Sequence, residues 1–470
     1  MLHVSTRGEA PAVGFTDAML TGLARDGGLY LPEAWPTLAR ETIADFAGRR
    51  YADVAKTVLG ALVDDVAAAD LGRMIEASYA TFRHPAVCPL AQIGDNLFVL
   101  ELFHGPTLAF KDVAMQLLGQ LMNHVLRARG TRATIIGATS GDTGSAAVEA
   151  FKGLDQVDVF ILYPHGRVSE VQRRQMTGVD APNVHVIALE GTFDDCQAVV
   201  KALFNHARFR DELQLSGVNS INWARIAAQT VYYFTAAVAL GGPHRPISFA
   251  VPTGNFGDIL AAWVAQRMGL PVGRLMLATN ANDILARTLA TGTYELRGVV
   301  PTTSPSMDIQ ISSNFERLLF EACGRDAAAV RRLMASLAQS RAFTMAPEAL
   351  ARIRRDFAAE AVGEDAVLAE IRDTWAEAGY LLDPHTAVGV RTARALLARE
   401  PGTPVVALAT AHPSKFPDAV EQATGVRPSL PAHLADLLDR RERFTVLPHD
   451  QGAVEAFIRG RARAVRGAAA

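Results

Sequence analysis

The feature that most constrains the fold is a regular alternation of short apolar segments with amphipathic segments of helical length. No hairpin turn separates neighbouring apolar segments, so each connects to the next through a crossover. Such βαβ units build parallel sheets covered by helices on both faces. The sequence therefore predicts an α/β protein with open, mostly parallel sheets, and strands are expected at residues 97–102, 134–138, 157–163, 184–189, 247–251, 274–278 and 405–409.

The chain has 470 residues, which is long enough for two or three domains. Residues 1–95 have mostly helical patterns and are expected to form a helical N-terminal domain. A smaller α/β domain is expected at residues 96–240 and a larger one at residues 241–470. The Arg- and Ala-rich stretch at about residues 320–380 is expected to be a helical insertion in the larger domain.

Lysine is scarce in this chain: of 46 Lys and Arg residues, only five are lysines. Arginine stays protonated, whereas a buried lysine can lose its proton and form a Schiff base. Lys111 stands out because it follows the turn-forming pair Gly105-Pro106 and begins an apolar helical run. Since a lone helix lysine is most often a surface residue, its role has to be judged from the neighbouring loops.

Three polar loops follow expected strands, where ligands bind in open α/β sheets. Residues 139–144 place hydroxyls, two glycines and an Asp before a helix, so backbone N–H groups point at an anion. Residues 253–257 have the same placement, with glycines that allow close approach to a phosphate. The third loop is residues 409–415. Each loop alone is also typical of a capped βα turn, but three beside a rare lysine favour a binding site.

The motifs of nucleotide-binding sites are missing from the sequence. No lysine follows a glycine and no Gly-x-Gly triplet occurs, which excludes a P-loop and a dinucleotide fingerprint. Neither a His-Glu-x-x-His segment nor a Cys-x-x-Cys pair is present, so no metal is expected. A Schiff-base lysine beside a glycine-rich phosphate cradle suits pyridoxal 5'-phosphate, which has an aldehyde and a phosphate. This cofactor is therefore expected.

Composition argues against several other classes of protein. The net charge is −3 with no basic block, so no nucleic-acid partner is expected. No apolar run of membrane length occurs, so no membrane partner is expected. The three cysteines, Cys88, Cys196 and Cys323, lie far apart, which predicts a reducing, cytoplasmic compartment. We expect a monomer or a weak homodimer.

Several segments resemble threonine synthases of the longer bacterial and fungal subgroup, and the resemblance covers nearly the whole chain. Together these segments are specific, and they are residues 5–8, 26–30, 103–107, 110–112, 139–144, 219–225, 252–258 and 308–317. The resemblance implies a fold type II pyridoxal-phosphate enzyme. It also implies a lyase that converts O-phospho-L-homoserine and water to L-threonine and phosphate, the last step of threonine biosynthesis.

The resemblance implies roles for individual residues. Lys111 would be the catalytic lysine that forms the Schiff base, residues 253–258 would surround the cofactor phosphate, and Thr410 would face the pyridine nitrogen. The implied cofactor-binding residues are Lys111, Asp142, Thr253, Gly254, Asn255, Phe256, Gly257, Asp258 and Thr410. The implied substrate-binding residues are Thr139, Ser140, Gly141, Thr143, Asn219, Ser220 and Arg225.

One position departs from the wider fold type II pattern. In related enzymes the fourth residue of the 139–144 loop is Asn and contacts the 3′ oxygen of the cofactor, whereas here it is Asp142. A carboxylate repels a phenolate oxygen unless one of them is protonated. The ring contact at this position is therefore open.

Three alternatives to this reaction remain: a threonine synthase-like phospho-lyase, a serine or threonine dehydratase, and a non-catalytic pyridoxal-phosphate-binding paralogue. Retention of Lys111 disfavours the paralogue, and the phosphate segment at residues 219–225 disfavours the dehydratase, whose substrate has no phosphate. We expect His104, His385 and His412, near the expected active-site loops, to have packing or supporting roles.

Overall fold

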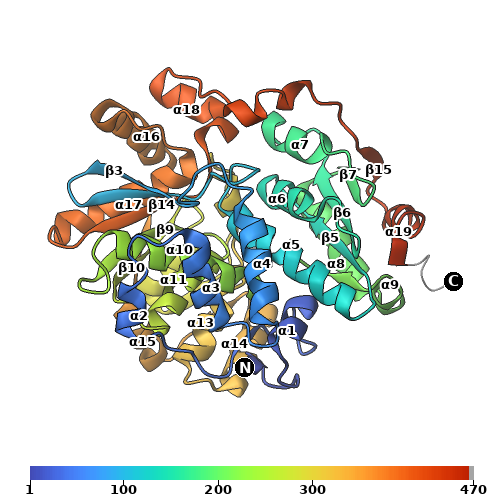
Figure 1. Ribbon diagram of the computed structural model, residues 1–470, viewed down its shortest axis with the longest axis horizontal. Coiled ribbons are helices and arrows are strands. Elements are labelled where there is room, and N and C mark those ends of the chain that lie inside the picture. Colours follow the sequence, from blue (N-terminus) through green and yellow to red (C-terminus); the bar gives the residue numbers. More distant parts are fainter. Residues whose placement is uncertain (465–470) are drawn as a thin grey trace.

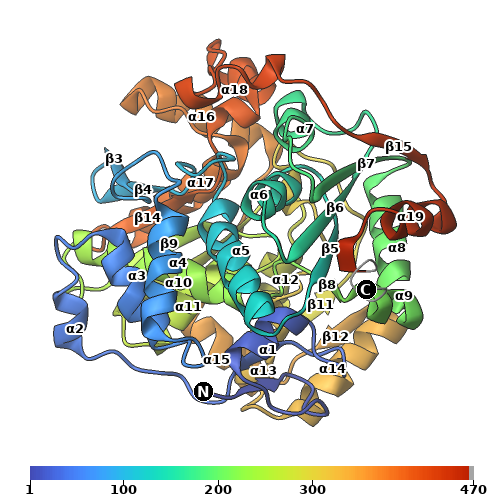
Figure 2. The same ribbon diagram turned by 45° about the vertical axis from the view of Figure 1, so that its right-hand side comes forward.

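The computed structural model describes residues 1–464, and two sheets set its architecture (Figure 1). In the smaller sheet every pairing is parallel. Its order is β15 (Thr445–Pro448), β7 (Val184–Glu190), β6 (Val157–Pro164), β5 (Ala133–Ala138) and β8 (Leu215–Ser216). Figure 2 shows α6 (Asp142–Phe151) and α8 (Phe193–Asn205) on opposite sides of this sheet.

The larger sheet is parallel except at one edge, where two neighbouring strands form an antiparallel pair. Its order is β13 (Phe357–Ala361), β10 (Val272–Thr279), β9 (Ile247–Pro252), β14 (Val405–Ala409), β4 (Leu97–Glu101) and β3 (Leu90–Gly94). Two small antiparallel pairs complete the strands: β1 (His3–Ser5) with β2 (Tyr30–Pro32), and β11 (Thr293–Glu295) with β12 (Ala342–Thr344).

Helices cover both sheets, and four helices lie in the N-terminal region, where loops and the short strands β1 and β2 connect them (Figures 1 and 2). The N-terminal helices are α1 (Phe15–Thr21), α2 (Arg40–Ala44), α3 (Tyr51–Gly60) and α4 (Ala68–Tyr79). The helices that follow are α5 (Lys111–Ala128), α7 (Glu170–Thr177), α9 (Ala207–Leu213), α10 (Trp223–Ala239), α11 (Gly257–Arg267), α12 (Ile284–Thr291), α13 (Phe315–Ala322), α14 (Ala327–Ser340), α15 (Pro347–Asp356), α16 (Glu364–Ala378), α17 (Pro384–Arg399), α18 (Pro417–Thr424) and α19 (Gln451–Arg459).

Local sequence explains why these elements begin where they do. Every residue of β6 is buried, as expected for a central strand of a sheet covered on both faces. Helix α8 begins with a capping box, in which Thr192 Oγ1 accepts from Asp195 N and Asp195 Oδ2 accepts from Thr192 N. Helix α10 begins after Asn222, whose side-chain oxygen accepts from Ala224 N at 3.1 Å.

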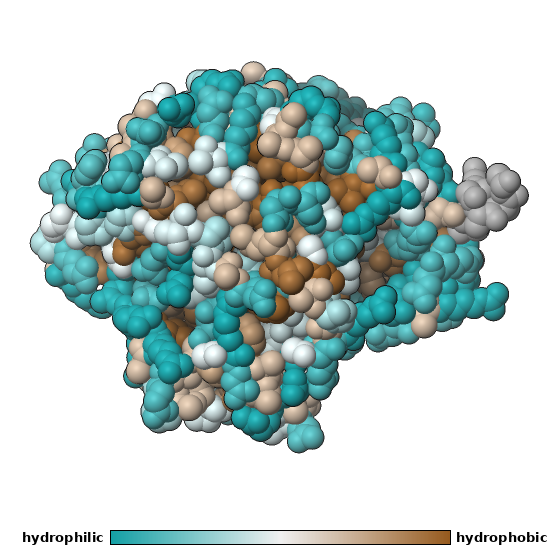
Figure 3. Space-filling view, turned by 60° about the horizontal axis from the view of Figure 1, so that its bottom comes forward, coloured by the Kyte–Doolittle hydropathy of each residue, from teal (hydrophilic) through white to brown (hydrophobic). Residues whose placement is uncertain are grey.

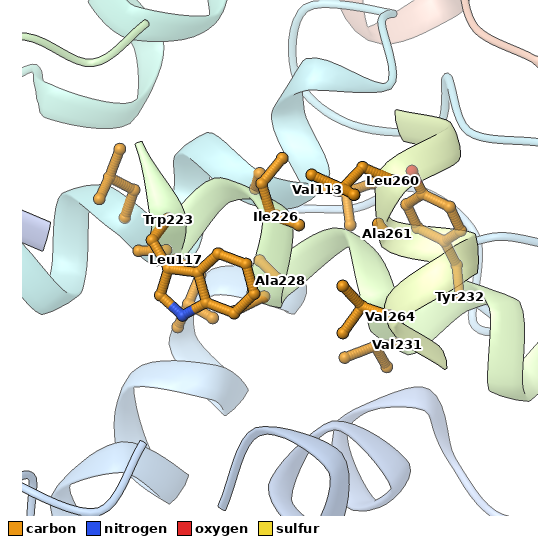
Figure 4. Packing of buried hydrophobic residues seen from close by; sticks show 14 of the residues in the cluster. Val113, Leu117, Trp223, Ile226, Ala228, Val231, Tyr232, Leu260, Ala261 and Val264 are labelled. Carbon is orange, nitrogen blue, oxygen red and sulfur yellow. The ribbon is translucent and has the colours of Figure 1, made fainter. Parts of the chain in front are cut away.

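Helices α5, α10 and α11 meet in the main hydrophobic core. Val113 and Leu117 of α5, Ile226 of α10 and Leu260 of α11 are all buried in it, and Figure 4 shows these side chains in this region. Burying each such side chain stabilises the fold by roughly 1.5–3 kcal/mol. This core fixes the positions of α5, which begins at Lys111, and of α11, which begins at Gly257.

The predicted fold class is confirmed, because both main sheets are mostly parallel and are covered by helices. All seven predicted strands occur, with ends that agree within two residues. The stretch at residues 320–380 is not wholly helical, since it contains β12 and β13. The sequence of β13, Phe-Ala-Ala-Glu-Ala, has no β-branched residue, which is why its pattern did not predict a strand.

The two sheets do not follow the order of the chain strictly. Strand β4 belongs to the larger sheet, and β15, near the end of the described chain, belongs to the smaller one. The division into units at residues 1–95, 96–240 and 241–470 stays a prediction.

Hydrophilic side chains separate the hydrophobic patches on the face that Figure 3 brings forward. No helix among residues 1–464 is long and apolar enough to cross a membrane.

Candidate active site

The loop after β14 and the loop before α5 lie side by side. Phe110 N donates to Thr410 O at 2.8 Å, and His412 N donates to Leu108 O at 3.0 Å. Both loops follow the carboxyl ends of paired parallel strands, β14 and β4. The structure therefore brings together the rare lysine and the third polar loop of the sequence.

Lys111 is the first residue of α5 and is buried. Its Nζ lies 3.3 Å from Asp142 Oδ2 and 4.7 Å from the centroid of the Phe110 ring. Burial lowers the pKa of Lys111; Asp142 opposes this effect, and the positive charges of Lys415 and Arg225 add to it. A lysine with a lowered pKa is suited to nucleophilic and base chemistry.

The loop at residues 139–144 is organised by the Thr139 hydroxyl, which accepts from Gly141 N and Gly144 N, each at 2.9 Å. Gly141 has a φ of 144°, and a Cβ there would overlap the side chain of Gln172, so this position requires glycine. Ser140 and Thr143 are partly buried, and their hydroxyls bond to nothing in the described chain. They are free to bind a ligand.

Asp142 is the first residue of α6, and its buried carboxylate has four neighbours. Oδ1 lies 2.8 Å from Lys415 Nζ and accepts from Gln172 Nε2 at 2.8 Å. Oδ2 accepts from Lys111 and, at 3.3 Å, from Ser306 Oγ. Although burial acts to raise it, Lys415 and Lys111 hold the pKa of Asp142 well below its usual range. Asp142 is therefore an ionised carboxylate.

The glycine loop at residues 253–257 joins β9 to α11. Phe256 has a φ of 64°, and its buried ring packs on Phe315 and Phe357, with centroids 5.5 and 5.6 Å apart. These contacts hold the loop in place. A Cβ on Gly254 would lie 3.0 Å from Ser306 O, so the loop packs tightly at this glycine. The N–H groups of the first turn of α11 lack helical partners and can bind an anion.

The Asp258 side chain faces α10 instead of the glycine loop. Its Oδ1 accepts from the hydroxyls of Tyr233, at 2.7 Å, and Tyr232, and its buried Oδ2 has no partner in the described chain. Burial raises the pKa of Asp258 to about 6. Only the backbone of Asp258, in the first turn of α11, belongs to the loop.

Arg225 lies in the first turn of α10 and is only 3% exposed. Nη1 donates to Val218 O at 3.1 Å, whereas the buried Nε has no hydrogen-bond partner in the part of the chain that the structure describes. No carboxylate among residues 1–464 forms an ion pair with this guanidinium. Burial lowers the pKa of Arg225 to about 10. A buried arginine without a carboxylate partner is costly unless an anion binds to it.

The segment at residues 219–225 and the glycine loop are tied together. Asn314 Nδ2 donates to Ser220 O at 3.1 Å and to Asn255 O at 3.0 Å. A Cβ on Gly257 would lie 3.9 Å from Ser220 Cβ. Asn219 is exposed. The two segments that the sequence associates with phosphate are therefore neighbours.

Thr410 is buried, and its hydroxyl has no hydrogen-bond partner in the described part of the chain. It lies directly beside the loop that leads to Lys111, through the bond from Phe110 N. A buried hydroxyl left free in this way can bond to a ring nitrogen of a ligand.

The sequence patterns assigned no role to several residues around Asp142 and the glycine loop. They are Gln172, Ser306, Asn314 and Lys415. A signal existed for Lys415, since it is one of five lysines and ends the third polar loop. Ser306 lies in the short 3-10 helix Pro305–Met307, and Asn314 directly precedes α13. Neither belongs to a motif of its own, although Asn314 falls within the resemblance segment 308–317.

The three histidines expected to support the site all have protein partners. His385 Nε2 accepts from Ser306 N at 3.3 Å, so its proton lies on Nδ1, 2.8 Å from Asp383 Oδ1. His104 Nε2 lies 2.7 Å from Glu101 Oε2. Burial lowers the pKa of His412 to about 4. His385 thus positions Ser306, a neighbour of Asp142.

The residues present fit pyridoxal 5'-phosphate. A buried lysine with a lowered pKa suits the aldehyde, the start of α11 with its two glycines suits the phosphate, and the free hydroxyl of Thr410 suits the ring nitrogen. Among residues 1–464, no group of three or more His, Cys, Asp or Glu side chains is arranged to hold a metal ion.

Comparison with known proteins agrees with this geometry. Three family models match successive parts of the chain: "Threonine synthase N terminus" at residues 2–79, "Pyridoxal-phosphate dependent enzyme" at 85–333 and "Threonine synthase, C-terminal" at 386–458. A threonine synthase from Pseudomonas aeruginosa is 52% identical over 460 residues, covering 97% of this chain and 98% of its own. The chain belongs to the threonine synthase family.

Solved structures of the threonine synthase family have the same fold. A pyridoxal-phosphate-bound threonine synthase from Brucella melitensis matches with a TM-score of 0.95 and 60% identity, covering 98% of this chain and 100% of the other. The yeast threonine synthase matches with a TM-score of 0.93 and 39% identity, covering 97% and 98%. The protein is thus a pyridoxal-phosphate-dependent enzyme of fold type II, as predicted.

Proposed function

We propose that this member of the threonine synthase family converts O-phospho-L-homoserine and water to L-threonine and phosphate. The observation that carries this proposal is Arg225. Its buried guanidinium has no carboxylate partner in the described chain and lies close enough to affect the pKa of Lys111. A second anion site beside the glycine loop is needed for a phosphorylated substrate but not for free serine or threonine.

The cofactor is held by three parts of the site in this proposal. Backbone N–H groups of Thr253 to Asp258 bind its phosphate, and the Thr410 hydroxyl bonds to its ring nitrogen. Lys111 would hold the cofactor at its aldehyde. When bound, pyridoxal 5'-phosphate supplies an electron-withdrawing ring that stabilises negative charge on the substrate carbon next to the amine.

Lys111 moves the protons of the reaction in this proposal. When it is not bound to the cofactor, the ε-amine of Lys111 would take the proton from Cα of the substrate and would move a proton from Cβ to Cγ. Burial lowers the pKa of Lys111, which favours the neutral amine that can accept a proton. Burial of the side chain limits exchange of these protons with water.

The departing phosphate leaves Cγ toward Arg225, with Asn219, Ser220 and Thr143 as further donors. Arg225 Nε has no hydrogen-bond partner within the described residues, so it can donate to a phosphate oxygen without breaking an existing bond. Water then adds its hydroxyl at Cβ, its other proton goes to the released phosphate, and a proton returns to Cα.

The substrate carboxylate is assigned to the loop at residues 139–144. Thr139 shapes this loop through its bonds to Gly141 N and Gly144 N, so the free hydroxyl of Ser140 and the backbone around Gly141 make the contacts.

Product analysis tests this proposal. The purified protein, loaded with pyridoxal 5'-phosphate, should release threonine and phosphate in equal amounts from O-phospho-L-homoserine, with no turnover of L-serine or L-threonine. Release of 2-oxobutanoate and ammonia together with phosphate would support the phospho-lyase. Turnover of free serine or threonine would support the dehydratase. Cofactor binding without any turnover would support the non-catalytic paralogue.

We also propose that the protein acts in the cytoplasm as a monomer or weak homodimer. Cys88, Cys196 and Cys323 are free thiols, two of them buried, which suits a reducing compartment. Sedimentation velocity over a range of concentrations tests the assembly, and a stable tetramer would contradict it.

A further inference from the structure

Two lysines share one carboxylate in the interior of the site. Lys415, at the end of the short 3-10 helix Pro413–Lys415, is 0% exposed. Its Nζ lies 2.8 Å from Asp142 Oδ1 and donates to Thr107 O at 2.8 Å. Lys111 lies on the other oxygen of the same carboxylate. The proposed reaction uses Lys111 but leaves Lys415 without a role.

Asp142 on its own would hinder Lys111. A carboxylate within about 4–6 Å of an amine favours the protonated form of that amine and shifts its pKa by about 1–3 units. A Schiff base forms when the neutral amine nitrogen bonds to the aldehyde carbon and the aldehyde oxygen leaves as water. An unopposed Asp142 would therefore favour the protonated form of Lys111, which would slow this step and weaken Lys111 as a base.

We propose that Lys415 is a positioning residue that neutralises Asp142 and so keeps the Lys111 amine available as nucleophile and base. Its ammonium occupies the Asp142 oxygen opposite Lys111, together with Gln172, so Asp142 orients Lys111 without the full effect of its negative charge. This inference rests on the proposed role of Lys111.

The surroundings of both lysines support this assignment. The charged groups that act on Lys111 are Asp142, Lys415 and Arg225, and Asp258 is close enough to be affected by Lys111 in turn. Lys415 and Arg225 both act to lower the pKa of Lys111, whereas Asp142 acts to raise it. The remaining neighbours of Asp142, Gln172 and Ser306, are uncharged, so among residues 1–464 only Lys415 offsets the carboxylate on its far side.

Lys415 also has a purely structural use, because its bond to Thr107 O holds the loop before α5. The neutralising and loop-holding roles predict different results when Asp142 is also changed. A neutralising role is lost with Lys415→Met but is no longer needed once Asp142→Asn removes the negative charge. A loop-holding role is lost equally in the single and the double variant.

The test is the pH dependence of Schiff-base formation between the apoprotein and added pyridoxal 5'-phosphate, followed by absorbance and fixed with borohydride. We expect the pH midpoint to rise by about one unit in Lys415→Met, to fall in Asp142→Asn, and to return near the wild-type value in the double variant. Lys201→Met, which removes an exposed lysine of α8, is the matched control and should leave the midpoint unchanged.

A midpoint in Lys415→Met equal to or below that of the wild type overturns the proposal, as does a double variant identical to Lys415→Met. If Lys415→Met does not fold, as judged by circular dichroism, the double variant is compared with Asp142→Asn instead. A higher midpoint in the double variant supports the proposal, and an equal or lower one overturns it. If the wild-type protein forms no borohydride-stable bond at Lys111, the proposed cofactor role of Lys111 fails instead, so the two failures are distinguishable.

Discussion

Replacing Arg225 by methionine should separate the effect of this residue on the free energy of unfolding from its effect on kcat/KM. Methionine fills a similar length of space without charge. In the apoprotein, the variant loses one hydrogen bond from the charged guanidinium, from Nη1 to Val218 O, which contributes about 1.5–3 kcal/mol. It also no longer buries a charge that lacks a carboxylate partner within residues 1–464, which offsets that loss. We therefore expect the free energy of unfolding to be unchanged or higher.

Turnover should respond in the opposite direction. Two charge-assisted bonds from Arg225 to the substrate phosphate contribute about 1.5–3 kcal/mol each, so their loss costs about 3 kcal/mol or more. Since about 1.4 kcal/mol is a factor of ten, kcat/KM for O-phospho-L-homoserine should fall at least about 100-fold. Cofactor occupancy, measured by absorbance, should not change, because the glycine loop is intact.

Arg317 is the matched control, since it is also a buried arginine but has its donors engaged. It donates to Tyr30 O at 2.8 Å, Ile221 O at 2.6 Å and the Asn314 side chain. Arg317→Met should therefore lower the free energy of unfolding, in urea denaturation, where Arg225→Met does not. If Arg225→Met destabilises the apoprotein as much as Arg317→Met and keeps its kcat/KM, then Arg225 is structural and the substrate-phosphate assignment is refuted.

Three further predictions concern the cofactor and pH. Lys111→Ala should remain folded, show no borohydride-stable cofactor and turn over negligibly; a label found by peptide mapping on another lysine of the wild type would contradict the assignment. Gly254→Ala, whose new Cβ would lie 3.0 Å from Ser306 O, should lower cofactor occupancy, whereas Gly298→Ala, which meets nothing within 4 Å, should not; equal occupancies would contradict the phosphate cradle. Burial raises the pKa of Asp258 from 3.8 to about 6, so its contribution to stability is lost as pH rises from about 4 to about 6. In urea denaturation of the apoprotein, the free energy of unfolding should fall by about 3 kcal/mol less over this pH range in Asp258→Asn than in the wild type. If the variant and the wild type lose the same free energy of unfolding over this range, the raised pKa of Asp258 is contradicted.

The parallel sheets could be predicted because their central strands are buried on both faces and so read as continuous apolar runs. Strand β6, with eight buried residues, is the clearest case. Two strands at sheet edges were not predicted. Strand β15 has no fully buried residue, and β13 is composed mostly of alanine, so neither has the apolar run of a buried strand. Their positions depend on pairing partners distant in sequence, which a local pattern does not contain.

The candidate site could be predicted only where residue types carry chemistry by themselves. Lys111 was identified because lysine is rare here and this one begins an apolar helix. The partnership of Asp142 with Lys415 depends on two loops from different sheets meeting, and nothing in the spacing of these residues indicates it. Asp258 shows the converse: it lies within the predicted loop, yet its side chain faces the tyrosines of α10.

The most direct test of the proposed reaction is to run it in water labelled with oxygen-18. If phosphate leaves Cγ by cleavage of the carbon–oxygen bond and water then adds at Cβ, the threonine formed should contain one solvent oxygen, on Cβ, and the phosphate should contain none. Mass spectrometry of both products measures this. Solvent oxygen in the phosphate would indicate simple phosphate-ester hydrolysis, and unlabelled threonine or mainly 2-oxobutanoate would contradict the addition of water at Cβ.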